Sequence, residues 1–209
     1  MYITELETPA VLLDLDIAEK NLQTYQQACD KYEKSLWPMV KTHKSSYLLK
    51  KQMELGAEGF LCGTIDECEM AVAAGAGKIM YAYPPANPKN ISRLAALAHQ
   101  ADVIIRIDHL DVAHMLESAA EKEGITFFYS IIVDMDFHRF GIAPSKVVAF
   151  AQEMQQFSHL KFFGISTHPG QVYGCTTEEE RQSVAKLETE TMGGVAADLK
   201  AAGFTDFFV

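Results

Sequence analysis

The sequence of 209 residues has few cysteines and none of the common cysteine or glycine motifs. Its four cysteines form no C-x-x-C pair, so neither a zinc knuckle nor a disulfide framework is indicated. No G-x-G-x-x-G follows the first apolar run, and G-x-x-x-x-G-K-[ST] does not occur. The usual phosphate-binding signatures of nucleotide-binding open sheets are therefore missing.

The sequence also lacks positive charge and long apolar runs. It has 18 Lys and Arg against 28 Asp and Glu, a net charge of −10, which argues against a nucleic-acid or anionic membrane surface. The first residues, MYITELETP, have neither the basic flank nor the apolar core of a signal peptide, and no run is long enough to cross a bilayer. We expect a soluble, cytoplasmic protein in which any anionic ligand needs a local positive site.

Short β-branched or aromatic runs alternate with amphipathic stretches along the whole chain, which is typical of parallel βαβ units. Helix starts are indicated by Asp16, by Thr64 with Glu67, by Asn87 before Pro88 and by Thr177 with Glu180. The expected strands are 10–15, 36–41, 59–63, 78–83, 102–107, 126–135, 161–167 and 206–209.

Eight such strands separated by helices predict an α/β fold with a (β/α)8 TIM-like barrel. We expect one domain over residues 1–209 that ends within its last strand. An open, doubly wound sheet is the alternative.

Lys41 is the first candidate for chemistry. In LWPMVK (36–41) a period of two places Trp37, Met39 and Lys41 on one face. A lysine at the carboxyl end of a barrel strand, among apolar neighbours that disfavour its charge, is suited to Schiff-base formation with an aldehyde. The alternative is a solvated lysine at a strand end.

A second cluster follows the sixth expected strand in VDMDFHRFGI (133–142). Asp134, Asp136, His138 and Arg139 come together there, and such a group is costly to place unless its members pair or bind a ligand. A salt-bridge network at the rim is the alternative.

A third candidate is ISTHPGQVYG (165–174) after the seventh expected strand. His168 precedes a Pro-Gly turn and Tyr173 lies within reach on the same loop. His168 could equally be an ordinary loop histidine.

These stretches together resemble the pyridoxal-phosphate enzymes with an alanine racemase-like (fold type III) barrel, most closely the D-threonine aldolase and D-serine dehydratase group. The resemblance covers nearly the whole chain. It is carried by TPAVLLDLDIAEKNL (8–22), VKTHK (40–44), VDMDFHRFG (133–141), STHPGQVY (166–173) and DFFV (206–209).

The resemblance implies a role for each of four residues. Lys41 would form the Schiff base with pyridoxal 5'-phosphate and act as a base, so that Lys41 and His168 are the expected catalytic residues. Arg139 would approach the phenolic oxygen of the cofactor. His168 and Tyr173 would flank the pyridine ring or form hydrogen bonds with it.

The resemblance also implies an activity, which is that of a lyase for D-amino acids with a β-hydroxyl group, of the aldolase or dehydratase type. An amino-acid racemase and a non-catalytic carrier of the cofactor are the alternatives. We expect a small-molecule D-amino acid as partner, no nucleic acid or membrane, and a homodimer.

Two departures from the family pattern stand out. Family members typically have Arg-Pro-His before Val-Lys, whereas this chain has Trp37, Pro38 and Met39, so two polar interior residues are replaced by apolar ones. Members also continue into a phosphate-binding loop and a C-terminal β domain, whose His and Cys ligate a divalent metal (Zn or Mn). That domain is absent from this sequence, so we expect no metal ligand in it.

Overall fold

The computed structural model describes residues 2–209 and is built around a parallel sheet of five strands in the order β1-β2-β3-β4-β5. Each strand pairs with the next one along the chain, because a helix returns the chain to the same end of the sheet every time. The strands are β1 (Phe60–Cys62), β2 (Lys78–Tyr81), β3 (Asp102–Ile107), β4 (Phe127–Ile132) and β5 (Leu160–Ser166).

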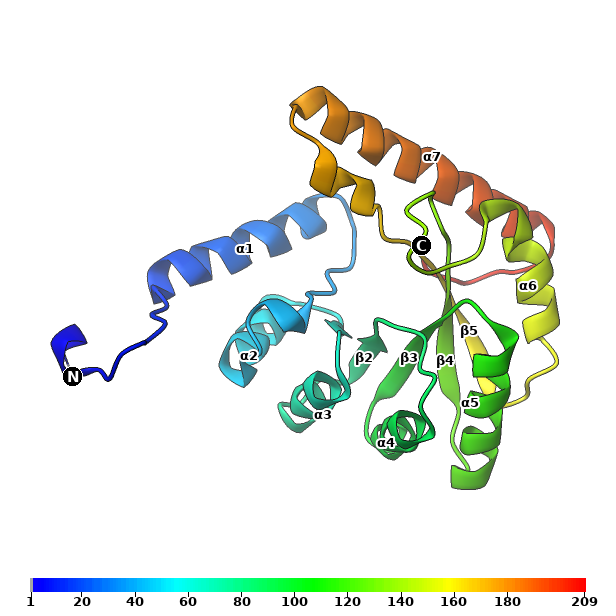
Figure 1. Ribbon diagram of the computed structural model, residues 1–209, viewed down its shortest axis with the longest axis horizontal. Coiled ribbons are helices and arrows are strands. Elements are labelled where there is room, and N and C mark those ends of the chain that lie inside the picture. Colours follow the sequence, from blue (N-terminus) through cyan, green and yellow to red (C-terminus); the bar gives the residue numbers. More distant parts are fainter. Residues whose placement is uncertain (1) are drawn as a thin grey trace.

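The α-helices follow one another around the outside of the curved sheet, whereas the N-terminal segment lies far from it (Figure 1). They are α1 (Leu15–Lys31), α2 (Ser46–Leu55), α3 (Ile65–Ala73), α4 (Pro88–Ala98), α5 (Leu110–Glu123), α6 (Val147–Met154) and α7 (Glu178–Ala201). Four short 3-10 helices complete the fold: η1 (Ile3–Glu5), η2 (Val40–Thr42), η3 (Pro144–Lys146) and η4 (Gly170–Gly174).

The start signals read from the sequence are mostly confirmed. Thr64 and Thr177 cap α3 and α7, and Asn87 caps α4 ahead of Pro88. The start of α1 was predicted two residues too late, because its capping carboxylate is Asp14, which accepts a hydrogen bond from the backbone N–H of Ile17 at 3.1 Å.

The sheet extends by single bridges on both sides. Met39 pairs with Leu61 next to β1, and Phe208 pairs with Gly164 next to β5. The expected strands at 36–41 and 206–209 are thus reduced to one bridge each. The parallel α/β order is confirmed, but the two outer bridges are not joined to each other among residues 2–209, so the closed barrel stays a prediction.

The expected strand at 10–15 is wrong. Residues 10–14 are irregular and α1 begins at Leu15. Val11 is 101% exposed and its apolar neighbours Leu12 and Leu13 are exposed as well. A strand needs the edge of another strand for its hydrogen bonds, and residues 2–209 offer none at this place.

Candidate functional site

Three polar side chains of the candidate site lie at the carboxyl ends of neighbouring strands, which is where parallel sheets bind their ligands. Arg106 on β3, Arg139 in the loop after β4 and His168 after β5 line one small hollow of about 10 Å³. The structure thereby brings together two residues that the sequence predicted, Arg139 and His168, and one that it did not.

Arg106 is buried in the interior of the sheet and is held from three sides. Its Nε donates to Oγ of Ser166 at 2.9 Å, and its terminal nitrogens donate to the carbonyl oxygens of Ala82 and Thr167 at 3.4 and 3.3 Å. Burial, helped by the positive charge of Arg139, lowers the pKa of Arg106 to about 10. The guanidinium is therefore a fixed cation at neutral pH.

Arg106 is the site residue that the sequence reading missed. Its signal is a cation inside the apolar run DVIIRI. An arginine among β-branched residues on a buried strand needs either a partner or a ligand.

His168 is the centre of this positive region. Burial lowers its pKa, and the charges of Arg139, Arg106 and Lys41 lower it further. Its Nε2 is buried and finds no hydrogen-bond partner among residues 2–209. At neutral pH the imidazole is therefore uncharged, with one ring nitrogen free to bind a ligand or to exchange a proton.

Aromatic rings surround His168. The ring of Phe137 lies 5.6 Å from the imidazole and the ring of Tyr173 lies 5.7 Å from it, measured between centroids. The predicted proximity of Tyr173 to His168 is confirmed, and 74% of Tyr173 is exposed. Two rings at this spacing make walls suited to a flat ligand.

The loop after β4 is held by Asp134. Its carboxylate accepts the backbone N–H groups of Phe137 and His138 at 3.1 and 3.0 Å and contacts Nδ1 of His138 at 2.9 Å. Burial acts to raise the pKa of Asp134, but these hydrogen bonds together with the charge of His138 lower it. Asp134 and His138 thus make a side-chain contact of the kind that the alternative, a network at the rim, implies.

Arg139 takes no part in the contact between Asp134 and His138. Its guanidinium lies over the rings of Phe137 and Phe140, 5.5 and 5.4 Å from their centroids. Among residues 2–209 no carboxylate pairs with it. The Asp134–His138 contact and the guanidinium of Arg139 are therefore separate parts of the same loop.

Lys41 lies on η2 rather than on a strand, and its side chain is exposed. Met39 lines a cleft together with Leu36 and Pro38, whereas the ring of Trp37 packs 5.8 Å from that of Phe163. The alternation expected over 36–41 thus ends before Lys41, and the predicted apolar enclosure of Lys41 is not found among residues 2–209. Its charge nevertheless reaches His168.

Lys44, three residues after Lys41, makes different contacts from those of Lys41. Nζ of Lys44 lies 3.3 Å from Oε1 of Glu67, whose other oxygen accepts the backbone N–H of Gly63 at 2.7 Å. Cβ and Cδ of Lys41 lie beside the same Gly63, 3.8 Å from where a Cβ atom on that residue would stand. Lys44 is thus committed to an ion pair, whereas Lys41 has no carboxylate partner among residues 2–209.

The largest space near Arg106, Arg139 and His168 lies next to Arg106. A cavity of about 950 Å³ is lined by residues of β2, β4 and β5, by Trp37 and by residues of α7. Ser166 and Thr167, both hydrogen-bonded to Arg106, form part of its wall. Ser130, whose hydroxyl donates to that of Ser166 at 2.9 Å, also belongs to it.

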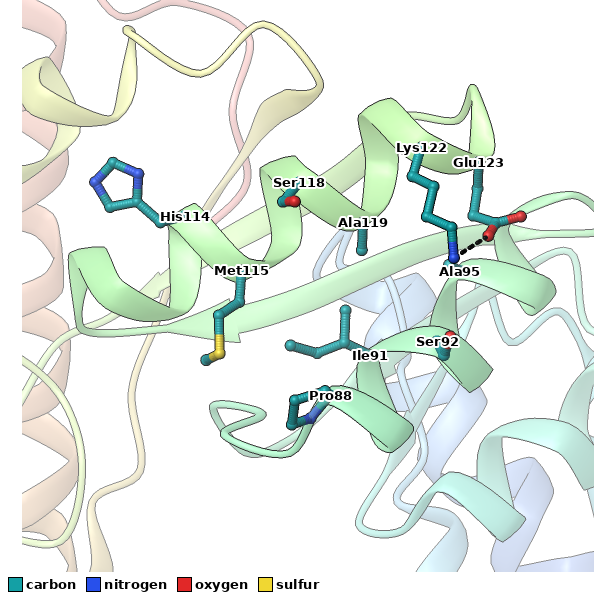
Figure 2. Close-up of a pocket in the computed structure, with 10 residues that line it drawn as sticks. All are labelled: Pro88, Ile91, Ser92, Ala95, His114, Met115, Ser118, Ala119, Lys122 and Glu123. Atoms are coloured by element: carbon teal, nitrogen blue, oxygen red, sulfur yellow. Dashed lines mark ion pairs between the residues drawn. The ribbon is translucent and has the colours of Figure 1, made fainter.

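A second hollow of about 400 Å³ lies on the outside, between α4 and α5. Figure 2 shows Ile91 and Met115 projecting into it from the two helices, with the Lys122–Glu123 ion pair, 3.8 Å long, at one end. None of the predicted site residues lines this groove.

Residues 2–209 contain no group of three or more His, Cys, Asp or Glu side chains that could hold a metal ion. No helix in this range combines the length and the apolar character that a bilayer crossing requires.

Comparison with known proteins gives consistent matches. The family model described as alanine racemase, N-terminal domain, matches residues 13–208. D-threonine aldolase from Arthrobacter sp is 27% identical over 202 residues, covering 96% of this chain and 53% of that protein. D-threo-3-hydroxyaspartate dehydratase from Delftia sp. (strain HT23) is 30% identical over 201 residues, covering 95% and 53%.

The solved structures agree with these matches. The crystal structure of D-threonine aldolase from Filomicrobium marinum superposes with a TM-score of 0.92 at 27% identity, covering 97% of this chain and 55% of that one. The chain thus spans about half the length of the relatives it matches.

Proposed function

Because the chain belongs to the alanine racemase N-terminal domain family, we propose that it binds pyridoxal 5'-phosphate and acts as a lyase on D-amino acids with a β-hydroxyl group. The names of its relatives support the second part, since they are an aldolase and a dehydratase for such substrates. The structural observation that carries the proposal is that Arg106, Arg139 and His168 line one hollow, in a chain of net charge −10, and that the charge of Lys41 also acts on His168.

The residues present fit an anionic, flat cofactor. The three cations match a phosphate ester and a carboxylate, and the rings of Phe137 and Tyr173 match the faces of a pyridine. The buried Nε2 of His168 lacks a partner that such a ligand could supply. When bound, pyridoxal phosphate supplies the electron sink for the bond that breaks at the α-carbon.

Each predicted site residue then has a proposed role. Lys41, which has no carboxylate partner among residues 2–209, would hold the cofactor's aldehyde carbon and accept a proton at Nζ. Arg139 would bind the phenolic oxygen, and Tyr173 would cover the ring. His168, uncharged at neutral pH, would hold or move a proton at Nε2.

The two lyase reactions differ in the bonds that break. In the aldolase reaction the β-hydroxyl loses its proton to a base and the bond between the α- and β-carbons breaks, which yields glycine and an aldehyde. In the dehydratase reaction the α-proton is removed and the β-hydroxyl leaves as water, so that a 2-oxo acid and ammonia result after hydrolysis. A divalent metal in a longer form, a homodimer and a cytoplasmic location remain predictions.

The test compares two neighbouring lysines. After incubation with pyridoxal phosphate and borohydride, we expect added mass on the peptide with Lys41, loss of this mass in Lys41→Ala, and its retention in Lys44→Ala. Equal labelling of Lys41→Ala and the unmodified chain would show that another residue reacts and would overturn the central assignment.

Turnover of D-threonine separates the activities. Glycine with acetaldehyde indicates an aldolase, 2-oxobutanoate with ammonia a dehydratase, and L-allo-threonine a racemase. Bound cofactor with no turnover of any of these would favour the carrier function instead.

A further inference from the structure

Glu67, in the first turn of α3, is a buried carboxylate beside the turn that carries Lys41. Only 4% of its side chain is exposed, and no other Asp or Glu within residues 2–209 is buried. Taking a carboxylate out of water is costly unless cations or N–H groups compensate its charge. The contacts of Glu67 therefore indicate what its burial achieves.

The two carboxylate oxygens of Glu67 make different contacts. Oε2 accepts the backbone N–H of Gly63 at 2.7 Å. Oε1 lies 3.3 Å from Nζ of Lys44, but the two groups are not aligned for a hydrogen bond, and Oε1 has no hydrogen-bond partner among residues 2–209. The charge of this oxygen is thus compensated by the ammonium group of Lys44, through attraction rather than through a hydrogen bond.

The backbone of Lys44 has an uncommon conformation. Its φ of 45° lies in the left-handed region, which side chains other than glycine rarely adopt. Its N–H donates to the carbonyl oxygen of Val40 at 2.9 Å, which closes the turn 40–44. A strained backbone persists only where surrounding contacts hold it. The ion pair with Glu67 is one such contact, so Glu67 helps to fix this turn.

Lys41 lies on the same turn and packs beside the same glycine. Cβ and Cδ of Lys41 are 3.8 Å, and Oε2 of Glu67 is 3.4 Å, from the place that a Cβ atom on Gly63 would take. The carboxylate also acts on His43 within the turn: burial lowers the pKa of His43, and the charge of Glu67 is one of the smaller effects that raise it. Glu67 thus acts on the turn both at Gly63 and at Lys44.

Lys41 and Lys44 are both exposed, so exposure alone does not decide which amine reacts with an aldehyde. An opposite charge nearby favours the ammonium form of a lysine. Only the neutral amine attacks an aldehyde carbon. The ion pair with Glu67 therefore disfavours reaction at Lys44, whereas Lys41 has no such partner among residues 2–209.

We propose that Glu67 is a positioning residue that makes Lys41, rather than Lys44, the amine that reacts with an aldehyde. It pairs with Lys44 and holds the turn 40–44 against Gly63. This inference rests on the proposed function, in which Lys41 holds the aldehyde carbon of the cofactor. Glu67 itself touches neither the aldehyde nor the cofactor in this role.

The experiment treats the full chain with limiting formaldehyde and cyanoborohydride. The neutral amine adds to the aldehyde carbon, its two protons leave with the carbonyl oxygen as water, and the reductant converts the C=N bond to a methylamine. Formaldehyde has neither a phosphate nor a ring, so the reaction compares the two amines alone. Tandem mass spectrometry of the peptides gives the ratio of label on Lys41 to label on Lys44.

We expect the wild-type chain to carry more label on Lys41 than on Lys44. Glu67→Gln keeps an acceptor for the N–H of Gly63 but loses the charge, and it should lower the ratio about fivefold. Glu69→Gln is the matched control, because Glu69 lies on the same helix and pairs with Arg93 instead. An unchanged ratio in Glu67→Gln, or no preference for Lys41 in the wild-type chain, would overturn the proposal.

A second measurement needs no substitution, and it applies even if Glu67→Gln does not fold. Salt at about 1 M screens a pair with one exposed partner, so the ratio in the wild-type chain should fall at least about twofold. A well-dispersed NMR spectrum checks that the chain stays folded in this salt. A ratio that does not respond to salt would contradict selection by charge.

Pyridoxal phosphate with borohydride separates this inference from the proposed function. Label on Lys41 alone, in the wild-type chain and in Glu67→Gln alike, would support the proposed function and show that selection by Glu67 is wrong. Label on neither lysine, together with the expected change towards formaldehyde, would support selection by Glu67 and count against the proposed cofactor chemistry.

Discussion

Arg106 and Ser166 lie 60 residues apart in the chain, yet Nε of the arginine donates to the serine hydroxyl at 2.9 Å. This contact links β3 with β5 across β4, where Ser130 joins the same hydroxyl. The carbonyl oxygens of Ala82 and Thr167 accept the remaining bonds of the guanidinium. One buried cation thereby ties together the carboxyl ends of the strands that carry the site.

Replacement of this cation should destabilise the fold. In Arg106→Met the serine and the two carbonyl oxygens lose a charged donor while they stay mostly buried, and we expect the free energy of unfolding to fall by about 2–3 kcal/mol. Urea unfolding measures the change. Arg181→Met is the control, because Arg181 is exposed and pairs with the exposed Glu178, so its loss should cost less than about 0.5 kcal/mol. Equal losses would mean that Arg106 does not tie the strands.

The pKa of His168 should depend on the charge of Arg139. Since burial and then Arg139 lower the pKa of His168, Arg139→Met should raise this pKa towards 6.5, as measured by an NMR titration of the imidazole. Arg93→Met is the control, because Arg93 pairs with Glu69 and Asp66 on α3. An unchanged pKa of His168 in Arg139→Met would show that the charge of Arg139 does not lower it.

Stability should fall on mild acidification. The pKa values of His43 and His168 lie below their ordinary value of 6.5 in the folded chain. Below pH 6.5 the unfolded state therefore binds more protons, and the free energy of unfolding decreases as the pH falls towards the folded pKa values. Above pH 6.5 this contribution is fully present.

Denaturant titrations between pH 7 and pH 5 test this dependence. Each histidine contributes a slope below about 1.4 kcal/mol per pH unit, so His168→Gln should flatten the curve. His99→Gln, at an exposed position, should leave it as it is. A steeper curve for His168→Gln would contradict the direction of the shift.

The sequence predicts those parts of the fold that depend on local patterns. The runs at 102–107 and 126–135 contain β3 and β4, and the cap at Thr177 was found with its partner Glu180. Residues 10–15 have the same apolar pattern but no neighbouring edge among residues 2–209. Pairing is a property of two segments, so one segment alone does not reveal it.

The site was predictable only in part for a similar reason. His168, Arg139 and Tyr173 follow strand ends, and parallel strands bring such ends together. The exposure of Lys41 depends on where the chain turns at η2, and the role of Arg106 depends on β5, 60 residues away.

Two glycines of η4 provide the last prediction. A Cβ atom on Gly170 would overlap the ring of Phe137, whereas a Cβ atom on Gly174 would meet nothing within 4 Å. Gly170→Ala must therefore displace the ring that lies against His168, and we expect a loss of about 1–3 kcal/mol in unfolding free energy. Gly174→Ala should change it by less than about 1 kcal/mol.

Both variants add one methyl group to η4, and only the methyl group at position 170 meets Phe137. Urea unfolding gives the stability, and the imidazole resonances of His168 show whether the ring has moved. We expect a shift in Gly170→Ala alone. If both variants unfold alike and neither shifts these resonances, the space beside Phe137 is looser than its contact with Gly170 implies, and the aromatic wall beside His168 is not fixed by this turn.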